Sequence, residues 1–392
     1  MKDQLQYKKS IADYLELSPT QVTLFWKGRV GLYGILQALG VGPGDEVIIP
    51  AFTCVVVPNA IKYLGARPIY AEIDAQTYNI AVERLAEKIT PQTKVILAQN
   101  TFGLSSDFDG IQRIAERQGI RVIEDCTHGF GGTYKGQPNG TLASAAFYST
   151  QWNKPFSTGL GGIVVCRDLA LAEQLAQFEA KVATPSFKTD QMLSLQRFVR
   201  SNLLPPALYW SALKLYRFLS KHNLITGSSQ GTELEEPVMP PDYLWGMSAA
   251  QARAGIKALQ SFTENLAHRQ QIAAIYHEGL AKIGITPPLV PAYANHTFIK
   301  YPILVKDRPT FLRQAEKEKI QLGDWFLSPI HPIEKNFERW DYPYGTFPIA
   351  EKISEHMLNL STDKSISIKE AHRIVTFLQR KQAALCLPNL NL

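Results

Sequence analysis

The stretch FYSTQWNKPFSTGLGG, residues 147–162, decides how the rest of the chain is interpreted. Lys154 lies in it, five positions after Ser149 and shortly before a run of glycines. About thirty residues upstream, Asp125 ends an apolar segment. A lysine amine forms a Schiff base with an aldehyde, a carboxylate keeps a pyridine nitrogen protonated, and hydroxyl and backbone donors hold a phosphate. These residue types in this order predict pyridoxal phosphate as the cofactor.

Short β-branched segments alternate with amphipathic stretches between about residues 28 and 168. The expected strands are 46–50, 68–72, 95–98, 121–124, 145–148 and 162–166, and the expected helices are 30–39, 55–64, 81–89 and 108–118. Strands separated by crossover helices predict a mostly parallel α/β sheet covered on both faces. Ligands of such sheets lie beyond the carboxyl ends of the strands, where Asp125 and the loop before Lys154 fall.

Residues 185–235 interrupt this alternation. Within them, the segment 193–219 carries Leu, Phe, Trp and Tyr almost all round a helix, with Arg and Lys interspersed. This composition favours a packed helical insertion or a subunit contact, and a surface lying on a membrane is the less favoured alternative.

A long helical pattern from Met247 to about Leu280 leads into a second region of short strands and helices. Its expected elements are a strand at 301–305 and helices at 309–319 and 368–378. We therefore expect a large cofactor-binding domain at residues 1–245. A linking helix and a small C-terminal α+β domain follow at residues 246–392.

The composition is that of a globular protein. Of the 392 residues, 45% are hydrophobic and 19% are charged, which excludes a disordered chain. The net charge of +6 comes from scattered Lys and Arg, so we expect no nucleic-acid partner and an affinity for acidic small molecules. No run approaches the length of a membrane span, and the N-terminal residues lack the pattern of a secretory signal.

The cysteines are few and widely spaced, at positions 54, 126, 166 and 386. Their spacing has neither the paired pattern of a zinc site nor that of a redox dithiol. We therefore expect reduced thiols, no metal, and a cytoplasmic location.

Three motifs together carry a family resemblance. They are GPGDEVIIP at 42–50, VIEDCTH at 122–128, and the segment that ends in Lys154. In order and spacing they resemble the DegT-like nucleotide-sugar aminotransferases, which are fold type I pyridoxal phosphate enzymes. The resemblance runs from about Trp26 to Cys166 and returns at 247–276 and 353–378. It implies a fold type I transferase, with a mostly parallel sheet between helices and a smaller C-terminal α+β domain.

The resemblance also implies roles for four residues. Lys154 would form the Schiff base and then move a proton between the substrate carbon and C4′ of the cofactor, which requires a neutral, desolvated amine. Asp125 would pair with the pyridinium nitrogen, His128 would contact the phenolic oxygen, and Ser149 would bind the phosphate. The alternatives are an ordinary surface lysine, a helix-capping aspartate and a merely packed histidine.

Two further positions complete the expected cofactor site. Gly28 and Arg29 begin a helix, so their backbone amides form a natural anion site. Arg29 stands where relatives usually have Thr, and its guanidinium either adds to the phosphate contacts or turns to solvent. Cys54 stands where many relatives carry an aromatic residue that stacks on the pyridine ring. A cysteine covers the ring without stacking.

The chain departs from the family pattern on the substrate side. Leu244 and Gly246 replace the Asn and Arg of a loop that reaches the phosphate and substrate of the neighbouring subunit. Asn100-Thr-Phe-Gly103 replaces a more usual His-aromatic-aromatic-Gly. These changes leave the cofactor chemistry in place and alter the side that meets the substrate.

The expected function is a pyridoxal phosphate-dependent aminotransferase. We expect glutamate as donor and a keto-sugar, linked to a nucleotide, as acceptor, for the synthesis of amino sugars, surface polysaccharides or secondary metabolites. A lysine at position 154 argues against the similar sugar dehydratases, in which His replaces it. The alternatives are a catalytically silent cofactor-binding regulator and an aminotransferase for a lipid-linked or non-sugar keto substrate. We expect a homodimer, because a partner loop completes each active site in fold type I enzymes.

Overall fold

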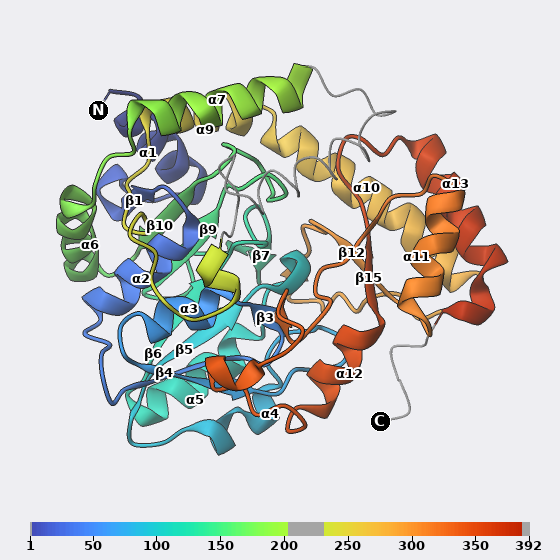
Figure 1. The fold of residues 1–392 in the computed structure, drawn as a ribbon, viewed down its shortest axis with the longest axis horizontal. Helices are drawn as coiled ribbons and strands as arrows, with labels where there is room; N and C mark the ends of the chain where they lie inside the picture. The colour runs from blue at the N-terminus through green and yellow to red at the C-terminus, as the bar shows by residue number, and fades with distance from the viewer. Residues whose placement is uncertain (1, 203–230, 386–392) are drawn as a thin grey trace.

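The computed structural model describes residues 2–202 and 231–385 (Figure 1). Its centre is a seven-stranded sheet in the order β1-β10-β9-β6-β5-β2-β4. The strands are β1 (Val22–Phe25), β2 (Glu46–Pro50), β4 (Arg67–Ala71), β5 (Thr93–Gln99), β6 (Arg121–Asp125), β9 (Ala145–Ser149) and β10 (Gly162–Cys166). Strands β4, β2, β5, β6 and β9 are parallel. Strand β10 runs antiparallel to β9, and β1 runs antiparallel to β10. The expected mostly parallel α/β sheet is confirmed, and β1 is a strand that the pattern did not predict.

Both faces of the sheet are buried because successive side chains point to opposite sides. On β2, Ile49 joins a core with the helices α2 (Gly28–Ala38), α3 (Val56–Lys62) and α6 (Leu169–Lys181). Its neighbour Ile48 packs on the other face with α5 (Phe108–Gln118). Helices α1 (Lys2–Leu15) and α9 (Ala249–Gln260) cover the β1–β10 end of that second face. Hence the strands are apolar runs without polar alternation.

The helix boundaries follow local sequence signals. Asp107 caps α5 by accepting a hydrogen bond from the backbone of Gly110, and Gly119 ends it in the left-handed conformation at φ 66°. The helix expected at 81–89 is a short α4 (Val82–Leu85) continued by a 3-10 turn, η2 (Ala86–Lys88). The helix predicted at 108–118 therefore matches α5, whereas the residues predicted as a helix at 81–89 form only one short helical turn and a 3-10 turn.

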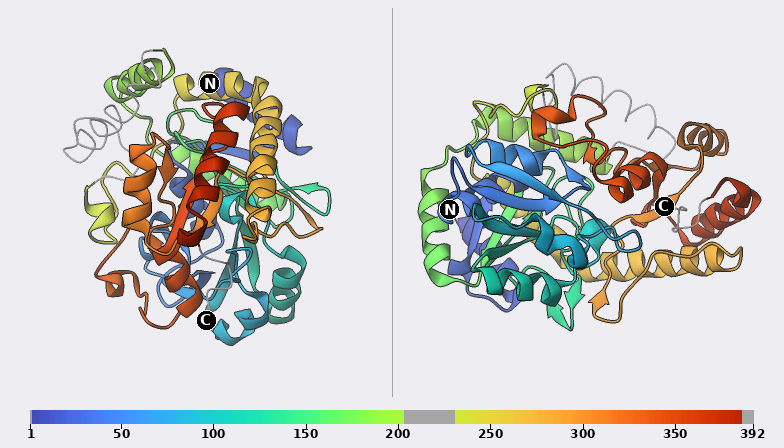
Figure 2. Two further views of the ribbon diagram at one scale, coloured as in Figure 1. Left: turned by 90° about the vertical axis from the view of Figure 1, so that its right-hand side faces the viewer. Right: turned by 90° about the horizontal axis from the view of Figure 1, so that it is seen from below.

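The C-terminal region has its own core. Figure 2 shows the helices of this region, in orange and red, grouped to one side of the central sheet. The single long helix expected at 247–280 is two helices, α9 and α10 (Phe262–Ala281), separated at Ser261. Beyond them, β12 (Tyr301–Leu304), β15 (Met357–Leu360) and β13 (Leu322–Gly323) form a three-stranded antiparallel sheet. Helices α11 (Arg308–Lys317), α12 (Pro348–His356) and α13 (Ile368–Arg380) accompany it. The domain division at residue 245 stays a prediction.

One strand pair joins the two regions. Ile330–His331 (β14) pairs in parallel with Thr53–Cys54 (β3), which follows β2 at the carboxyl end of the sheet. The pairing is reinforced by hydrogen bonds from the backbone amides of Thr53 and Val55 to the carbonyls of Pro329 and His331. The C-terminal region therefore reaches the edge of the sheet where ligands of α/β proteins bind.

The first part of the expected insertion is a helix, α7 (Phe187–Asn202), which lies along α9 (Figure 1). Arg197 donates to the carbonyl of Ala250, and Ser248 donates to Asp190. Of the segment 193–219 that the sequence singles out, residues 203–219 lie outside the described part. Among the residues that the structure describes, no helix combines the length and apolar character needed to cross a membrane.

The start of α2 depends on the absence of a side chain at Gly162. A Cβ there would lie 2.4 Å from the carbonyl oxygen of Lys27 and 2.7 Å from the amide nitrogen of Gly28. We expect Gly162→Ala to lower the free energy of unfolding by about 1–3 kcal/mol, because the backbone must shift. Gly42→Ala is the matched control, since an added Cβ meets nothing within 4 Å. Equal urea midpoints for the two variants would contradict this explanation.

Candidate active site

A pocket of about 230 Å³ lies at the carboxyl ends of the central strands. Asp125 ends β6 and Ser149 ends β9, while Lys154 belongs to the loop between β9 and β10. All seven residues predicted for the cofactor site line this one pocket: Gly28, Arg29, Cys54, Asp125, His128, Ser149 and Lys154. They come from four separate segments of the chain, so their convergence depends on the fold. The roles assigned to them stay predictions.

One end of the pocket has the geometry of a phosphate cradle. Helix α2 begins at Gly28, and the first amides of a helix have no partners within it, although here the amide of Val30 donates to the carbonyl of Lys27. Gly28 packs closely on the end of β9, since a Cβ added to it would lie 3.1 Å from the Cβ of Ser149. A helix N-terminus beside a hydroxyl suits a phosphate group.

Of the two alternatives that the sequence left open for Arg29, the structure contradicts the one in which its side chain turns to solvent, and a contact with the phosphate stays a prediction. Its guanidinium is buried and pairs with the carboxylate of Glu233, with Nη1 and Oε1 2.5 Å apart, so it does not turn to solvent. Glu233 is itself fixed, because its carbonyl accepts from the Asn59 side chain. The Arg29 carbonyl accepts from the hydroxyl of Tyr243. Glu233 lies far along the chain, so no local pattern links it to Arg29.

Asp125 is buried at the end of the central strand β6. Its Oδ1 accepts from the backbone N–H of Thr127, so it stabilises a turn and caps no helix. Burial raises the pKa of its carboxyl, and the hydrogen bonds from Thr127 and the charge of Lys154 oppose that shift. A cationic pyridinium placed against it would favour the carboxylate further.

His128 is fixed as a neutral donor. Its Nδ1 accepts from the backbone N–H of Phe102 at 3.2 Å, which leaves the proton of the neutral ring on Nε2. Burial, followed by the charges of Lys154 and Lys300, lowers the pKa of His128 well below its ordinary value. The ring also stacks on Trp325, with centroids 4.9 Å apart. His128 is therefore a packed ring, and it also has an Nε2–H group available to donate a hydrogen bond.

Lys154 is partly buried in the pocket and is not an ordinary surface lysine. Its Nζ lies 4.7 Å from the centroid of the Trp325 ring. Burial lowers the pKa of its ammonium to about 8, and the charges of Asp125 and Cys54 partly oppose this shift. A substantial neutral fraction near physiological pH is what a nucleophilic amine requires.

Sequence reasoning missed four residues that line or support this pocket. Trp325 and His331 come from the C-terminal region, Lys27 precedes α2, and Glu233 pairs with Arg29. The Nδ1 of His331 accepts from the backbone of Leu327, and burial lowers its pKa to about 4. Of the four, Lys27 was the easiest to find from the sequence, because it directly precedes Gly28, where the helix was predicted to begin.

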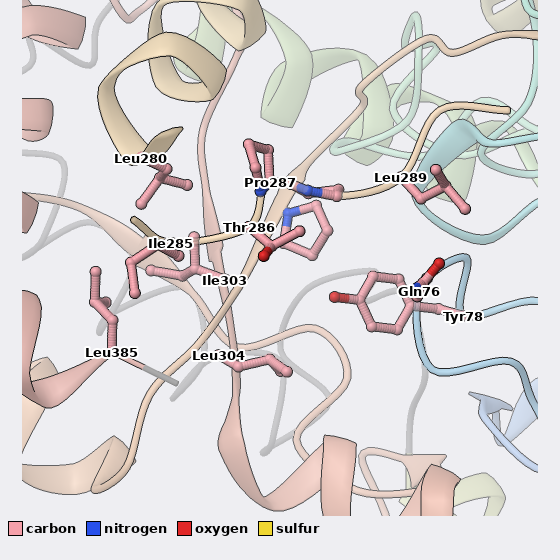
Figure 3. A pocket seen from close by; sticks show the side chains of 12 residues that line it. Gln76, Tyr78, Leu280, Ile285, Thr286, Pro287, Leu289, Ile303, Leu304 and Leu385 are labelled. Atoms are coloured by element: carbon pink, nitrogen blue, oxygen red, sulfur yellow. The ribbon is translucent and has the colours of Figure 1, made fainter. Parts of the chain in front are cut away.

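A different pocket, between residues 76–78 and the C-terminal region, has no such chemistry (Figure 3). Leu280, Ile285 and Ile303 are among the apolar side chains around it, and Tyr78 is the one titratable side chain among the described residues that line it. Within the described residues, no group of three or more His, Cys, Asp or Glu is placed to hold a metal. The candidate active site is therefore the pocket around Lys154.

A two-sided α/β sheet with a partly buried lysine, a buried carboxylate and a helix N-terminus at its carboxyl edge is typical of a pyridoxal phosphate-dependent transferase. Comparison with known proteins gives the family. The chain belongs to the DegT/DnrJ/EryC1/StrS aminotransferase family, whose model matches residues 2–196 and 216–379. The predicted family, enzyme class and pyridoxal phosphate cofactor are confirmed.

Named relatives cover most of the chain. GDP-perosamine synthase of Caulobacter vibrioides is 27% identical over 380 residues, which are 96% of this chain and 89% of that protein. UDP-2-acetamido-2-deoxy-3-oxo-D-glucuronate aminotransferase of Pseudomonas aeruginosa is 29% identical over 336 residues, covering 78% and 79%. The PLP form of Spr1654 from Streptococcus pneumoniae has the same fold, with a TM-score of 0.75 at 20% identity over 96% of this chain and 90% of that chain.

The buried ion pair gives a first test of the site. Glu233→Gln removes the charged partner of Arg29 inside the protein, so we expect the free energy of unfolding to fall by about 3–5 kcal/mol. Replacing both residues by Leu should cost less than the sum of the two single replacements, which a double-mutant cycle in urea would measure. Additive effects, or a loss below about 0.5 kcal/mol for Glu233→Gln, would contradict a coupled pair.

Lys154 gives a test of pH dependence. With a pKa of about 8 its neutral fraction rises as the pH rises, from roughly a tenth at pH 7 to roughly a half at pH 8. We expect the initial rate of cofactor capture by the cofactor-free protein to rise about fivefold over this interval and to level off above pH 9. Absorbance of the bound cofactor is the measurement. Lys154→Arg, which has no neutral form, should not capture the cofactor covalently at any of these pH values.

Proposed function

We propose that this protein transfers an amino group from glutamate to a keto-sugar carried on a nucleotide. The observation that carries the proposal is the convergence of Lys154, Asp125 and the α2 N-terminus in one pocket, in a member of an aminotransferase family. The names of the Caulobacter and Pseudomonas relatives support a nucleotide-linked sugar as acceptor.

The pocket residues fit pyridoxal phosphate in three ways: an anion cradle at Gly28 and Ser149, a buried carboxylate at Asp125, and a desolvated amine at Lys154. When bound, the cofactor supplies an aldehyde for amine exchange and a ring that withdraws electrons. Asp125 would keep the ring nitrogen protonated, and the Nε2–H of His128 would donate to the ring oxygen. Once the amine of the amino donor has displaced Lys154, the Nζ of Lys154 would take the proton from the α-carbon of the donor.

The aromatic environment supports the second role of Lys154. An amine over the face of Trp325 is attracted to the ring when charged, yet burial disfavours that charge. The two effects oppose each other, so the amine has access to both protonation states near neutral pH. A group that must accept and return a proton needs this balance.

Lys154→Ala tests the assignment. We expect it to abolish the glutamate-dependent change in cofactor absorbance and to lower turnover with keto-sugar nucleotides by at least about a thousandfold. Lys257→Ala, an exposed lysine on α9, is the control and should retain wild-type rates. If glutamate leaves the absorbance of the wild-type holoprotein unchanged, the proposal of a glutamate-dependent transferase fails.

We infer that the protein is a homodimer. Helix α7 exposes large apolar side chains, with Phe187 79% and Leu195 57% accessible, next to a buried Leu193. Exposed apolar groups on one helix are typical of a surface that another chain covers. Light scattering should give about 88 kDa, twice the 43.8 kDa chain. A monomer mass at micromolar concentration would contradict the inference.

A further inference from the structure

A second pocket, of about 480 Å³, adjoins the cofactor pocket. Lys154 and Trp325 line both, so a ligand in the second pocket lies next to the reacting amine. Most of its remaining wall comes from the C-terminal region, with a contribution from Arg200 at the end of α7. Its size is in the range of pockets that enclose a whole small-molecule ligand.

The charge of this second pocket is positive. Besides Lys154 it is lined by four cations, Arg200, Arg269, Lys300 and Lys364, and by two carboxylates, Asp324 and Asp363. The cations are not equivalent. Lys364 is exposed and pairs with Glu264 at 3.2 Å. Arg269 and Lys300 are less exposed and lie closer to the protein interior, so their charges are less screened.

Lys300 forms no hydrogen bond or salt bridge with the described residues, although it is half-buried in the wall of the pocket. Its charge acts on the buried ring of His128, which places it within electrostatic range of the cofactor pocket. Burial would raise the pKa of Asp363, but Lys300, the Ser365 hydrogen bonds and Arg269 outweigh burial and lower it. The carboxylates of Asp363 and Asp324 offset part of the cost of burying the Lys300 ammonium, and an anionic ligand in the pocket would offset more of it.

Arg269, on α10, is oriented with donors to spare. Its Nη1 donates to the carbonyl of Ile299 at 3.1 Å and to the hydroxyl of Thr362 at 3.0 Å. Among the described residues, Nε and Nη2 have no partner. A planar guanidinium held by one nitrogen presents its other N–H groups in a fixed fork, which matches the oxygens of a phosphate.

We propose that Arg269 and Lys300 form an anion-binding subsite that holds the diphosphate of the acceptor nucleotide. This inference rests on the proposed function and adds the residues that select the acceptor. A fork and a point charge side by side suit a group with two phosphates better than a single carboxylate. The larger volume of the second pocket, compared with the cofactor pocket, also favours an acceptor larger than an amino acid.

The test is a calorimetric titration of the holoprotein with UDP, GDP and dTDP. Lys300→Gln should weaken the tightest of these by about tenfold or more, because one charge-assisted contact to phosphate is lost. Arg269→Gln should act in the same direction. The matching nucleoside without phosphates should bind equally to wild type and variant. Lys364→Gln is the control and should change the affinity less than about threefold.

The donor half-reaction separates the possible failures. With glutamate alone, Lys300→Gln should keep the wild-type rate of the absorbance change within about twofold. If the variants bind all three diphosphates like wild type, or if wild type binds none, the subsite is wrong. If Lys300→Gln slows the glutamate step tenfold and spares diphosphate binding, the anion is the donor carboxylate and the inference is overturned. If glutamate does not change the absorbance of the wild-type protein but diphosphate binding still depends on Lys300, the proposed function is refuted and the anion-binding subsite is retained.

Discussion

The site depends on the removal of one amine from water. An ordinary lysine is almost fully charged at neutral pH and therefore a poor nucleophile. Burial brings the pKa of Lys154 to about 8, and the burial is produced by two distant parts of the chain. The loop between β9 and β10 carries the lysine, and Trp325 of the C-terminal region covers it. Neither part alone makes the amine reactive, so the contact between the regions is a condition of the chemistry.

The arrangement of charge around that amine follows from the same burial. Arg29 at the phosphate end would raise the positive potential of the pocket, but its pairing with Glu233 offsets that charge. The opposite side, toward the C-terminal region, has the cationic groups of Arg269 and Lys300, which form no salt bridge with the described residues. In the proposed arrangement, backbone amides and a hydroxyl would hold the cofactor's phosphate, whereas charged side chains would hold an anion in the adjoining pocket. Two anions can then be bound in neighbouring places by different means, which limits competition between them.

What the sequence could predict was local. Each strand of the sheet from β2 to β10 is a short apolar run, and Asp125 and Ser149 lie at the ends of two of these runs. Ligands of parallel sheets bind at the carboxyl ends of the strands, so the positions of these two residues could be predicted. Glu233, Trp325 and His331 could not be found in this way. They reach the pocket through contacts between residues far apart in the chain, and no periodicity encodes such contacts. The break at Ser261 was also hidden, because both flanking segments have helical patterns.

An aromatic ring in the wall of the pocket comes from the C-terminal region. Cys54 replaces an aromatic residue expected next to the cofactor ring, and a thiol cannot stack. The structure has an aromatic ring in the same pocket, but it belongs to Trp325, which stacks on His128 and faces the Nζ of Lys154. Cys54 in turn lies in β3, which pairs with β14 of the C-terminal region. Cys54 therefore lies on the strand that joins the two regions, and Trp325 belongs to the C-terminal region. The shape of the pocket then depends on how closely the two regions pack.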